Sequence, residues 1–291
     1  GKGLSETHLG IVFRELGVRP IITTKVEIMP DQAHDMAGAV RRSVEGSLKR
    51  LQLDWVDVVQ IHNPPAAKRN PEASGWMPIS YDDMMGPGGA LEGLERLRRE
   101  GKTRFLGFAC EDAEAQTAAR LLGTGLFQVI NVWYDLINPT AGVTLPPGLM
   151  VDYDYAGLLK NTAKADAGVA VIRPLAGGTL TDHAIAGGAR HPLAGGGLTR
   201  NPEVYQDMVG QAGALAFLSR PDRSLQRAAV QFILMNPAVS TVLAGPSELS
   251  QLEEMVACSG AGPLLEEDLA RVELVWRSNF GRWSGGVWAN V

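Results

Sequence analysis

The sequence comprises 291 residues, of which 45% are hydrophobic and 20% are charged, values usual for a globular protein with its own core. The formal net charge of -5 disfavours a nucleic-acid-binding protein, and no uninterrupted apolar run is long enough to cross a bilayer. The two cysteines, Cys110 and Cys258, lie far apart and in no metal-binding spacing. We therefore expect a cytoplasmic protein without a disulfide framework, a metal site, a nucleic-acid partner or a membrane span.

Strand-like and helix-like segments alternate along the chain. Short β-branched runs bounded by turn residues predict strands, and apolar residues at three-to-four-residue spacing predict helices. The expected strands cover residues 20–26, 56–61, 104–110, 127–134, 168–178 (a strand running into a turn) and 239–244. The expected helices cover residues 5–16, 36–51, 91–100, 113–122, 155–166, 224–235, 247–257 and 266–277. Residues 179–201, rich in Gly and His, are expected to form a long surface loop of the kind that often acts as a lid.

No tight hairpin joins two of these strands, so the alternation predicts a parallel sheet, either open and doubly wound or closed as a barrel. The barrel is favoured because no Gly-x-Gly-x-x-Gly follows the early strands. It is also favoured because polar residues recur where strands end, as at a barrel mouth: Lys25, His62, Cys110, Asn131 and Arg173. Six strands are fewer than the usual eight. We expect an α/β fold, a single (β/α)8 TIM-type barrel domain over residues 1–291, with its first two strands preceding Gly1.

Several short segments, each weak alone, together resemble the aldo-keto reductases over nearly the whole chain. They are Gly3-Leu-Ser-Glu6, Thr24-Lys-Val26, Gln60-Ile-His62, LERLRREGKTRFLG from Leu94 to Gly107, Pro174 to Gly178, and Gly245 to Glu254. The resemblance implies an NAD(P)H-dependent oxidoreductase that transfers hydride to or from an aldehyde, ketone, alcohol or sugar.

Family members use an Asp, a Tyr, a Lys and a His for this chemistry. The resemblance implies that Lys25 and His62 are the catalytic Lys and His, and that the Tyr immediately precedes Gly1 with the Asp further upstream. A buried ammonium stabilises the tyrosinate and so lowers the pKa of the tyrosine hydroxyl, which must protonate the alkoxide. The chain as given is therefore expected to be inactive alone. Without the resemblance, Lys25 reads as a strand-end lysine that reaches solvent and His62 as a core histidine.

The resemblance also implies the residues that contact the nicotinamide cofactor. Ala109 and Cys110 stand where many members have Ser-Asn for the carboxamide, and Asn131 stands at the family's glutamine position. Ile172 replaces an aromatic ring that stacks on the nicotinamide, while Arg173 either reaches the pyrophosphate or forms a salt bridge at the barrel rim. Pro174 and Leu175 complete this set.

The segment from Gly245 to Glu254 is expected to bind the adenine end of the cofactor. Ser247 caps the following helix, whose amino terminus can hold a phosphate, and Gln251 and Glu254 face the adenine. The alternative is an ordinary capped helix start. NADP(H) is expected ahead of NAD(H) as the family default, although this segment lacks the Lys or Arg that favours a 2′-phosphate.

The substrate is expected to be a small carbonyl compound or sugar, with Trp133 as the first candidate for its pocket wall. Trp76, Trp283 and Trp288 either join that wall or serve packing. One alternative function is an inactive barrel that binds a nicotinamide cofactor as a sensor or regulatory subunit. A barrel enzyme of unrelated chemistry, such as a lyase, is disfavoured because no second carboxylate or metal-ligand cluster accompanies Lys25 and His62.

Overall fold

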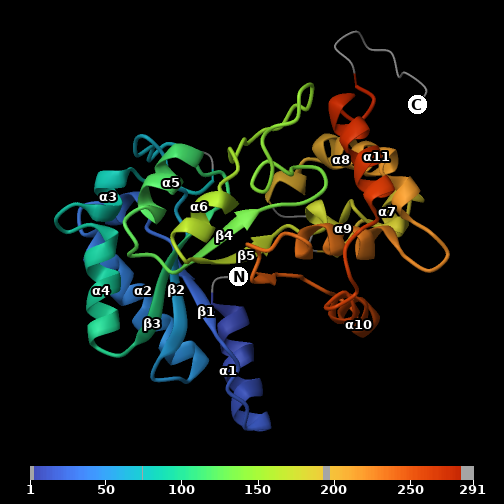
Figure 1. Ribbon diagram of the computed structural model, residues 1–291. Helices are drawn as coiled ribbons and strands as arrows, with labels where there is room; N and C mark the ends of the chain where they lie inside the picture. Colours follow the sequence, from blue (N-terminus) through green and yellow to red (C-terminus); the bar gives the residue numbers. More distant parts are fainter. Residues whose placement is uncertain (1–2, 74, 193–196, 283–291) are drawn as a thin grey trace. The chain divides into compact units, whose positions relative to one another are not determined.

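The computed structural model describes residues 3–73, 75–192 and 197–282 (Figure 1). The chain forms two compact units, the first comprising residues 1–131 and 161–168 and the second residues 132–160 and 169–291. The strand order in the sheet is β1-β2-β3-β4-β5-β6, so neighbours in the sheet are also neighbours along the chain. Strands β4 (Val129–Trp133) and β5 (Gly168–Ile172) begin in the first unit and end in the second.

The first unit contains three parallel strands and the helices that follow them. Strand β1 (Thr23–Val26) pairs with β2 (Val56–Ile61), which pairs with β3 (Thr103–Cys110). Its helices are α1 (Leu4–Leu16), η1 (Pro30–Gln32), α2 (Met36–Leu51), α3 (Tyr81–Met85), α4 (Ala90–Arg99), α5 (Ala115–Leu122) and most of α6 (Leu159–Lys164). Every residue of β2 is buried, including the polar Asp57 and Gln60 that interrupt its β-branched residues.

The second unit is built around β5, which pairs in parallel with β6 (Thr241–Val242). Its helices are η2 (Ala176–Gly178), α7 (Asp182–Ile185), η4 (Gly197–Arg200), α8 (Pro202–Ala214), η5 (Ala216–Leu218), α9 (Leu225–Leu234), α10 (Leu249–Ala257) and α11 (Glu266–Arg277). The expected α/β class with alternating strands and helices is therefore confirmed.

Helices α2 and α4 lie side by side in the first unit (Figure 1). Their close approach requires Gly93, because a Cβ there would lie 2.6 Å from the backbone oxygen of Ala37. Gly107 of β3 is likewise required, since a Cβ there would collide with the backbone oxygen of Val129. These two glycines set the helix-to-helix and strand-to-strand spacing within the unit.

Glu6 joins three elements of the first unit. Its carboxylate accepts hydrogen bonds from Thr24 Oγ1 of β1 at 2.5 Å and from Arg50 Nε of α2 at 2.7 Å. Burial raises the pKa of Glu6, but these hydrogen bonds outweigh burial and hold it below its usual range. The carboxylate therefore remains ionised and ties α1 to β1, the strand that carries Lys25.

Several local expectations were wrong. Helix α1 begins one residue before the expected start, at Leu4, with Gly3 as its N-cap, and ends at Leu16 as expected, followed by Gly17 in the left-handed conformation. The loop expected over residues 179–201 contains α7 and η4, and α8 was missed altogether. Strand β6 has only two residues, because the rest of the run expected for it is irregular backbone, and α6 has six residues, because turns occupy both ends of its expected run.

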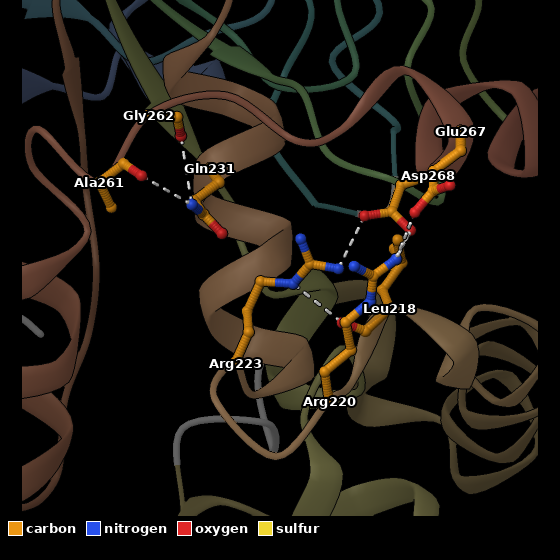
Figure 2. Close-up of polar contacts among 8 residues, drawn as sticks. All are labelled: Leu218, Arg220, Arg223, Gln231, Ala261, Gly262, Glu267 and Asp268. Carbon is orange, nitrogen blue, oxygen red and sulfur yellow. Dashed lines mark hydrogen bonds and ion pairs between the residues drawn. The ribbon is translucent and has the colours of Figure 1, made fainter.

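A buried carboxylate fastens α11 within the second unit (Figure 2). Asp268 in the first turn of α11 is 3% exposed and accepts from Arg220 Nη2 at 2.5 Å and from Arg223 Nη2 at 2.9 Å. Arg223 also donates to the backbone oxygen of Leu218 at 3.0 Å. Neighbouring Glu267 contacts Arg220 at 3.5 Å but is 74% exposed. The two arginines before α9 and one carboxylate of α11 thus form a single ion cluster.

Replacing Asp268 with Asn should destabilise the second unit, because two guanidinium groups lose their buried counter-charge. We expect the D268N variant to lose about 3 kcal/mol of unfolding free energy in urea denaturation followed by circular dichroism. The matched variant E267Q removes the exposed charge next to this cluster and should cost at most about 0.5 kcal/mol. Equal losses in the two variants would contradict this account.

Candidate active site

Parallel pairing of β1 with β2 brings Lys25 and His62 to one face of the sheet. Lys25 pairs with Gln60, and His62 follows two residues later, so both side chains project from the same face. The backbone N–H of His62 donates to the backbone oxygen of Val26 at 2.7 Å, which continues the pairing beyond β2. Thr24, which alternates with Lys25, bonds to Glu6 of α1. Helix α1 therefore covers the opposite face, and Lys25 and His62 point away from it.

Burial and mutual repulsion keep His62 neutral. Burial and, to a smaller extent, the nearby cation of Lys25 together lower the pKa of His62 to about 4. Burial also lowers the pKa of the Lys25 ammonium, and the negative charge of Glu111 opposes this shift. The site therefore combines an ammonium with a neutral imidazole that can donate one hydrogen bond and accept another.

The ring of His62 packs against Trp76, with ring centroids 3.9 Å apart. Neighbouring Asn63 is fully buried and bonds to the backbone of the chain after β1. Its Oδ1 accepts from Ile28 N at 2.7 Å, and its Nδ2 donates to the backbone oxygens of Ile28 and Met77 at 2.9 Å. Trp76 follows β2 in a loop that Asn63 fastens through Met77, so the indole and imidazole are held together.

Within the described part of the first unit, two buried side-chain amides have no hydrogen-bond partner. They are the side chains of Gln60, which pairs with Lys25, and of Asn131, the last residue of β4 that belongs to the first unit. A buried amide without partners costs free energy unless a ligand satisfies it. The donor and acceptor of Asn131 match those of a nicotinamide carboxamide, so the residues present fit that group.

Ala109 and Cys110 lie at the end of β3 but on opposite faces. Gly107 pairs with Gln60, so Ala109, two residues later, shares the face of Lys25 and His62. Cys110 projects from the other face and is fully buried, and burial raises the pKa of its thiol. The thiol thus stays protonated and behaves as a small core residue.

The remaining expected site residues lie in the second unit. Arg173 follows β5 in the left-handed conformation with φ 55°, and its guanidinium lies over the ring of Trp133, 5.3 Å from the ring centroid. Ile172 and Pro174 are buried and Leu175 is half-buried. The structure thus brings Trp133 and Arg173 together.

The segment from Gly245 to Glu254 differs from expectation at its helix start. Helix α10 begins at Leu249 with Glu248 as N-cap and without a side-chain cap, so Ser247 does not cap it. Instead, Gln251 Oε1 accepts from the backbone N–H of Ser247 at 2.9 Å. Gly245 is exposed, whereas the Glu254 carboxylate accepts hydrogen bonds from Ser224 and Gln226. Glu254 is therefore engaged within the helix packing of the second unit.

A cavity of about 660 Å³ lies between α2 and α4 of the first unit. Arginine and acidic side chains line it, and Lys25 and His62 do not.

No group of three or more His, Cys, Asp or Glu side chains in the described parts of the chain is placed to hold a metal ion. None of the described helices is both long enough and apolar enough to span a bilayer. Trp283 and Trp288 lie outside the described residues.

Comparison with known proteins decides the family. The sequence model of the aldo/keto reductase family matches residues 1–277. The chain belongs to the aldo/keto reductase family. This reductase family member is 28% identical to L-galactose dehydrogenase of Arabidopsis thaliana over 271 residues, covering 88% of this chain and 70% of the relative. It is also 28% identical to protein tas of Escherichia coli K12, covering 94% of this chain and 80% of that protein.

Solved structures agree on the fold of this aldo/keto reductase. An aldo-keto reductase from Bacillus halodurans in its holo form superposes with a TM-score of 0.66 at 19% identity, covering 98% of this chain and 82% of that one. Together with the family match, this makes the chain an oxidoreductase homologue with the α/β fold expected from its motifs.

Sequence reasoning missed three residues that shape the site: Asn63, Glu111 and Asp135. Asn63 directly follows His62, and Glu111 follows β3, so position after a strand was an available signal. Asp135 lies in a turn after β4, and its contact with Trp133 depends on how that turn folds. Nothing local in the sequence indicates this contact.

The stability of the protein should fall in acid because of His62. Its folded-state pKa of about 4 lies below the ordinary histidine value of 6.5, so the unfolded chain binds the proton first as the pH falls. Stability from this group is complete above pH 6.5 and should decline by about 2 kcal/mol towards pH 4. Urea titrations at several pH values should show a flatter profile for H62Q than for the wild type. The control H8Q removes an exposed histidine from α1 and should keep the wild-type slope; a flattened slope in H8Q would contradict the assignment.

Proposed function

We propose that this protein is an NAD(P)H-dependent oxidoreductase that reduces an aldehyde or ketone, or oxidises an alcohol or sugar, by hydride transfer in the cytoplasm. The proposal assigns Lys25 and His62 as its catalytic residues. The observation that carries it is the placement of an ammonium and a neutral imidazole on one face of two paired strands. The match to the aldo/keto reductase family supports this assignment.

In the proposed reaction, a bound nicotinamide cofactor supplies or accepts the hydride. The neutral imidazole of His62 donates a hydrogen bond to the substrate oxygen and so orients the carbonyl group. The Lys25 ammonium stabilises the anionic form of a tyrosine hydroxyl that gives its proton to the developing alkoxide. Trp76, packed on His62, keeps the imidazole from rotating and helps to exclude water.

The tyrosine and its companion aspartate are proposed to come from residues that precede Gly1, as part of the first two strands of the barrel. Apolar side chains on one face of α1 support this proposal. Leu9, Val12 and Leu16 recur at helical spacing and are exposed, although such a stripe normally packs against a sheet. We propose that residues 1–291 form one barrel domain that these strands complete.

Asn131 and Ala109 are the proposed carboxamide contacts, and Ile172 is the proposed apolar contact of the nicotinamide ring. Cys110 projects from the other face of β3, so it is proposed to support this region only by packing in the core. Arg173, Pro174 and Leu175 are proposed to hold the pyrophosphate. Gly245, Ser247 and Gln251, with Glu254 behind them, are the proposed adenine-side contacts. NADP(H) is proposed ahead of NAD(H).

Turnover should be lost when either catalytic side chain is replaced. In a chain that carries the upstream tyrosine and aspartate, K25M and H62Q should each lower kcat for carbonyl reduction by about 10²- to 10⁴-fold. Both variants should still bind NADPH in fluorescence titrations. The exposed lysine of α2 offers a matched control, because K49M removes an equal charge and should keep wild-type kcat.

The same titrations separate the alternatives. Binding of NADPH or NADH without turnover of any aldehyde, ketone or sugar by the wild type would favour a cofactor-binding sensor or regulatory subunit. Binding of neither cofactor would overturn the proposal. Tighter binding of NADH than NADPH would overturn the cofactor preference alone.

A further inference from the structure

A carboxylate with no assigned role is buried in the second unit. Asp135 is fully buried, and its Oδ1 accepts from the backbone N–H groups of Ile137 and Asn138, both at 2.8 Å. Its Oδ2 accepts from Trp133 Nε1 at 2.6 Å. Both oxygens of the carboxylate are therefore engaged, one by the turn and one by the indole.

A buried indole does not need a charged partner. In the same unit, the indole N–H of Trp276 is satisfied by the neutral backbone oxygen of Leu136 at 2.8 Å. Trp133 is 3% exposed and uses a carboxylate instead. Burying that charge is costly, and burial raises the pKa of Asp135 to about 6 despite the hydrogen bonds and the Arg173 cation, which act to lower it. A neutral acceptor would have served packing at lower cost.

Arg173 supplies the reason for the charge. Its guanidinium lies over the face of the Trp133 ring while the Asp135 carboxylate holds the edge of that ring. The Arg173 cation also acts on the Asp135 carboxyl, whose pKa it lowers. The indole is thus held between an anion at its edge and a cation over its face, and a fixed ring fixes the cation that stacks on it.

We propose that Asp135 is a positioning residue that acts through Trp133 to hold the Arg173 guanidinium in place for the phosphate of the nicotinamide cofactor. This inference rests on the proposed function, because the anion is a cofactor phosphate. It assigns Trp133 to the support of Arg173, since the guanidinium already covers a face of the indole. The left-handed backbone of Arg173 adds a second constraint on the position of this side chain.

The sign of one substitution distinguishes positioning from plain electrostatics. In D135N the amide oxygen can still accept from the turn, but the amide NH₂ group would face the indole N–H, so two donors meet. Removing a negative charge near Arg173 would by itself strengthen binding of an anionic cofactor. Loss of position predicts the opposite, and we expect NADPH to bind D135N about tenfold more weakly than the wild type.

Fluorescence titration with NADPH and NADH should compare the full-length wild type with D135N, W133F and the double variant. If Asp135 acts through Trp133, D135N should weaken binding much less in the W133F background. The control D154N alters an exposed carboxylate that accepts from the backbone N–H of Ala156 in a similar turn, and should bind as the wild type does. Equal or tighter binding by D135N, or additive losses in the double variant, would overturn the inference.

Nuclear magnetic resonance of the indole N–H groups gives a readout that does not depend on the cofactor. The resonance that disappears in W133F should shift with pH around a midpoint near 6, where the Asp135 carboxyl takes up its proton, and should not titrate in D135N. Absence of this titration in the wild type would overturn the inference even if the cofactor binds. Titration of the indole in a protein that binds neither cofactor would instead overturn the proposed function and retain the link between Asp135 and Trp133.

Discussion

The candidate catalytic pair depends on the register of β1 against β2. A shift of one residue would turn Lys25 towards α1 and separate it from His62. Asn63 fixes this register from beyond the strand ends, because its buried amide both accepts from and donates to the backbone of Ile28. The same amide holds Met77, next to the tryptophan that packs on His62. One asparagine therefore organises the ammonium, the imidazole and the indole.

Burial gives each titratable group of this pair its chemical state. The imidazole loses solvent and lies near a cation, so it remains neutral at physiological pH. The ammonium also loses solvent but retains the negative charge of Glu111 nearby, which opposes the loss of its proton. A neutral hydrogen-bond donor beside a cation is suited to a reaction in which negative charge develops on a substrate oxygen. An exposed lysine and an exposed histidine would lack these shifted pKa values. Burial within the fold therefore creates the combination.

The sequence predicted those elements whose signals are local. Helices α2 and α11 have the bounds that their apolar spacing predicts, strand β2 has those of its β-branched run, and α1 ends at Leu16 as expected. The start of α8 carried a usable signal that was overlooked, since Asn201 caps the helix and Pro202 occupies its first turn. The roles of Lys25 and His62 came from the family resemblance. The contacts of Asp135 and Asn63 could not be predicted, because each joins a side chain to partners whose position is set by turns and strand pairing.

The two units contain different kinds of buried polar group. In the described part of the first unit, the side-chain amides of Gln60 and Asn131 are buried without hydrogen-bond partners. A ligand that bonds to them would remove the free-energy cost of leaving them unsatisfied. In the second unit, the polar groups around Trp133 already bond to one another, so a ligand there meets a cation whose position is fixed before binding. Specificity for a carboxamide arises more readily from unsatisfied groups, because a ligand that lacks the matching donor and acceptor leaves them buried and unpaired. A phosphate needs only a well-placed positive charge. Unpaired buried amides therefore suit the recognition of a carboxamide, whereas a guanidinium positioned before binding suits a phosphate.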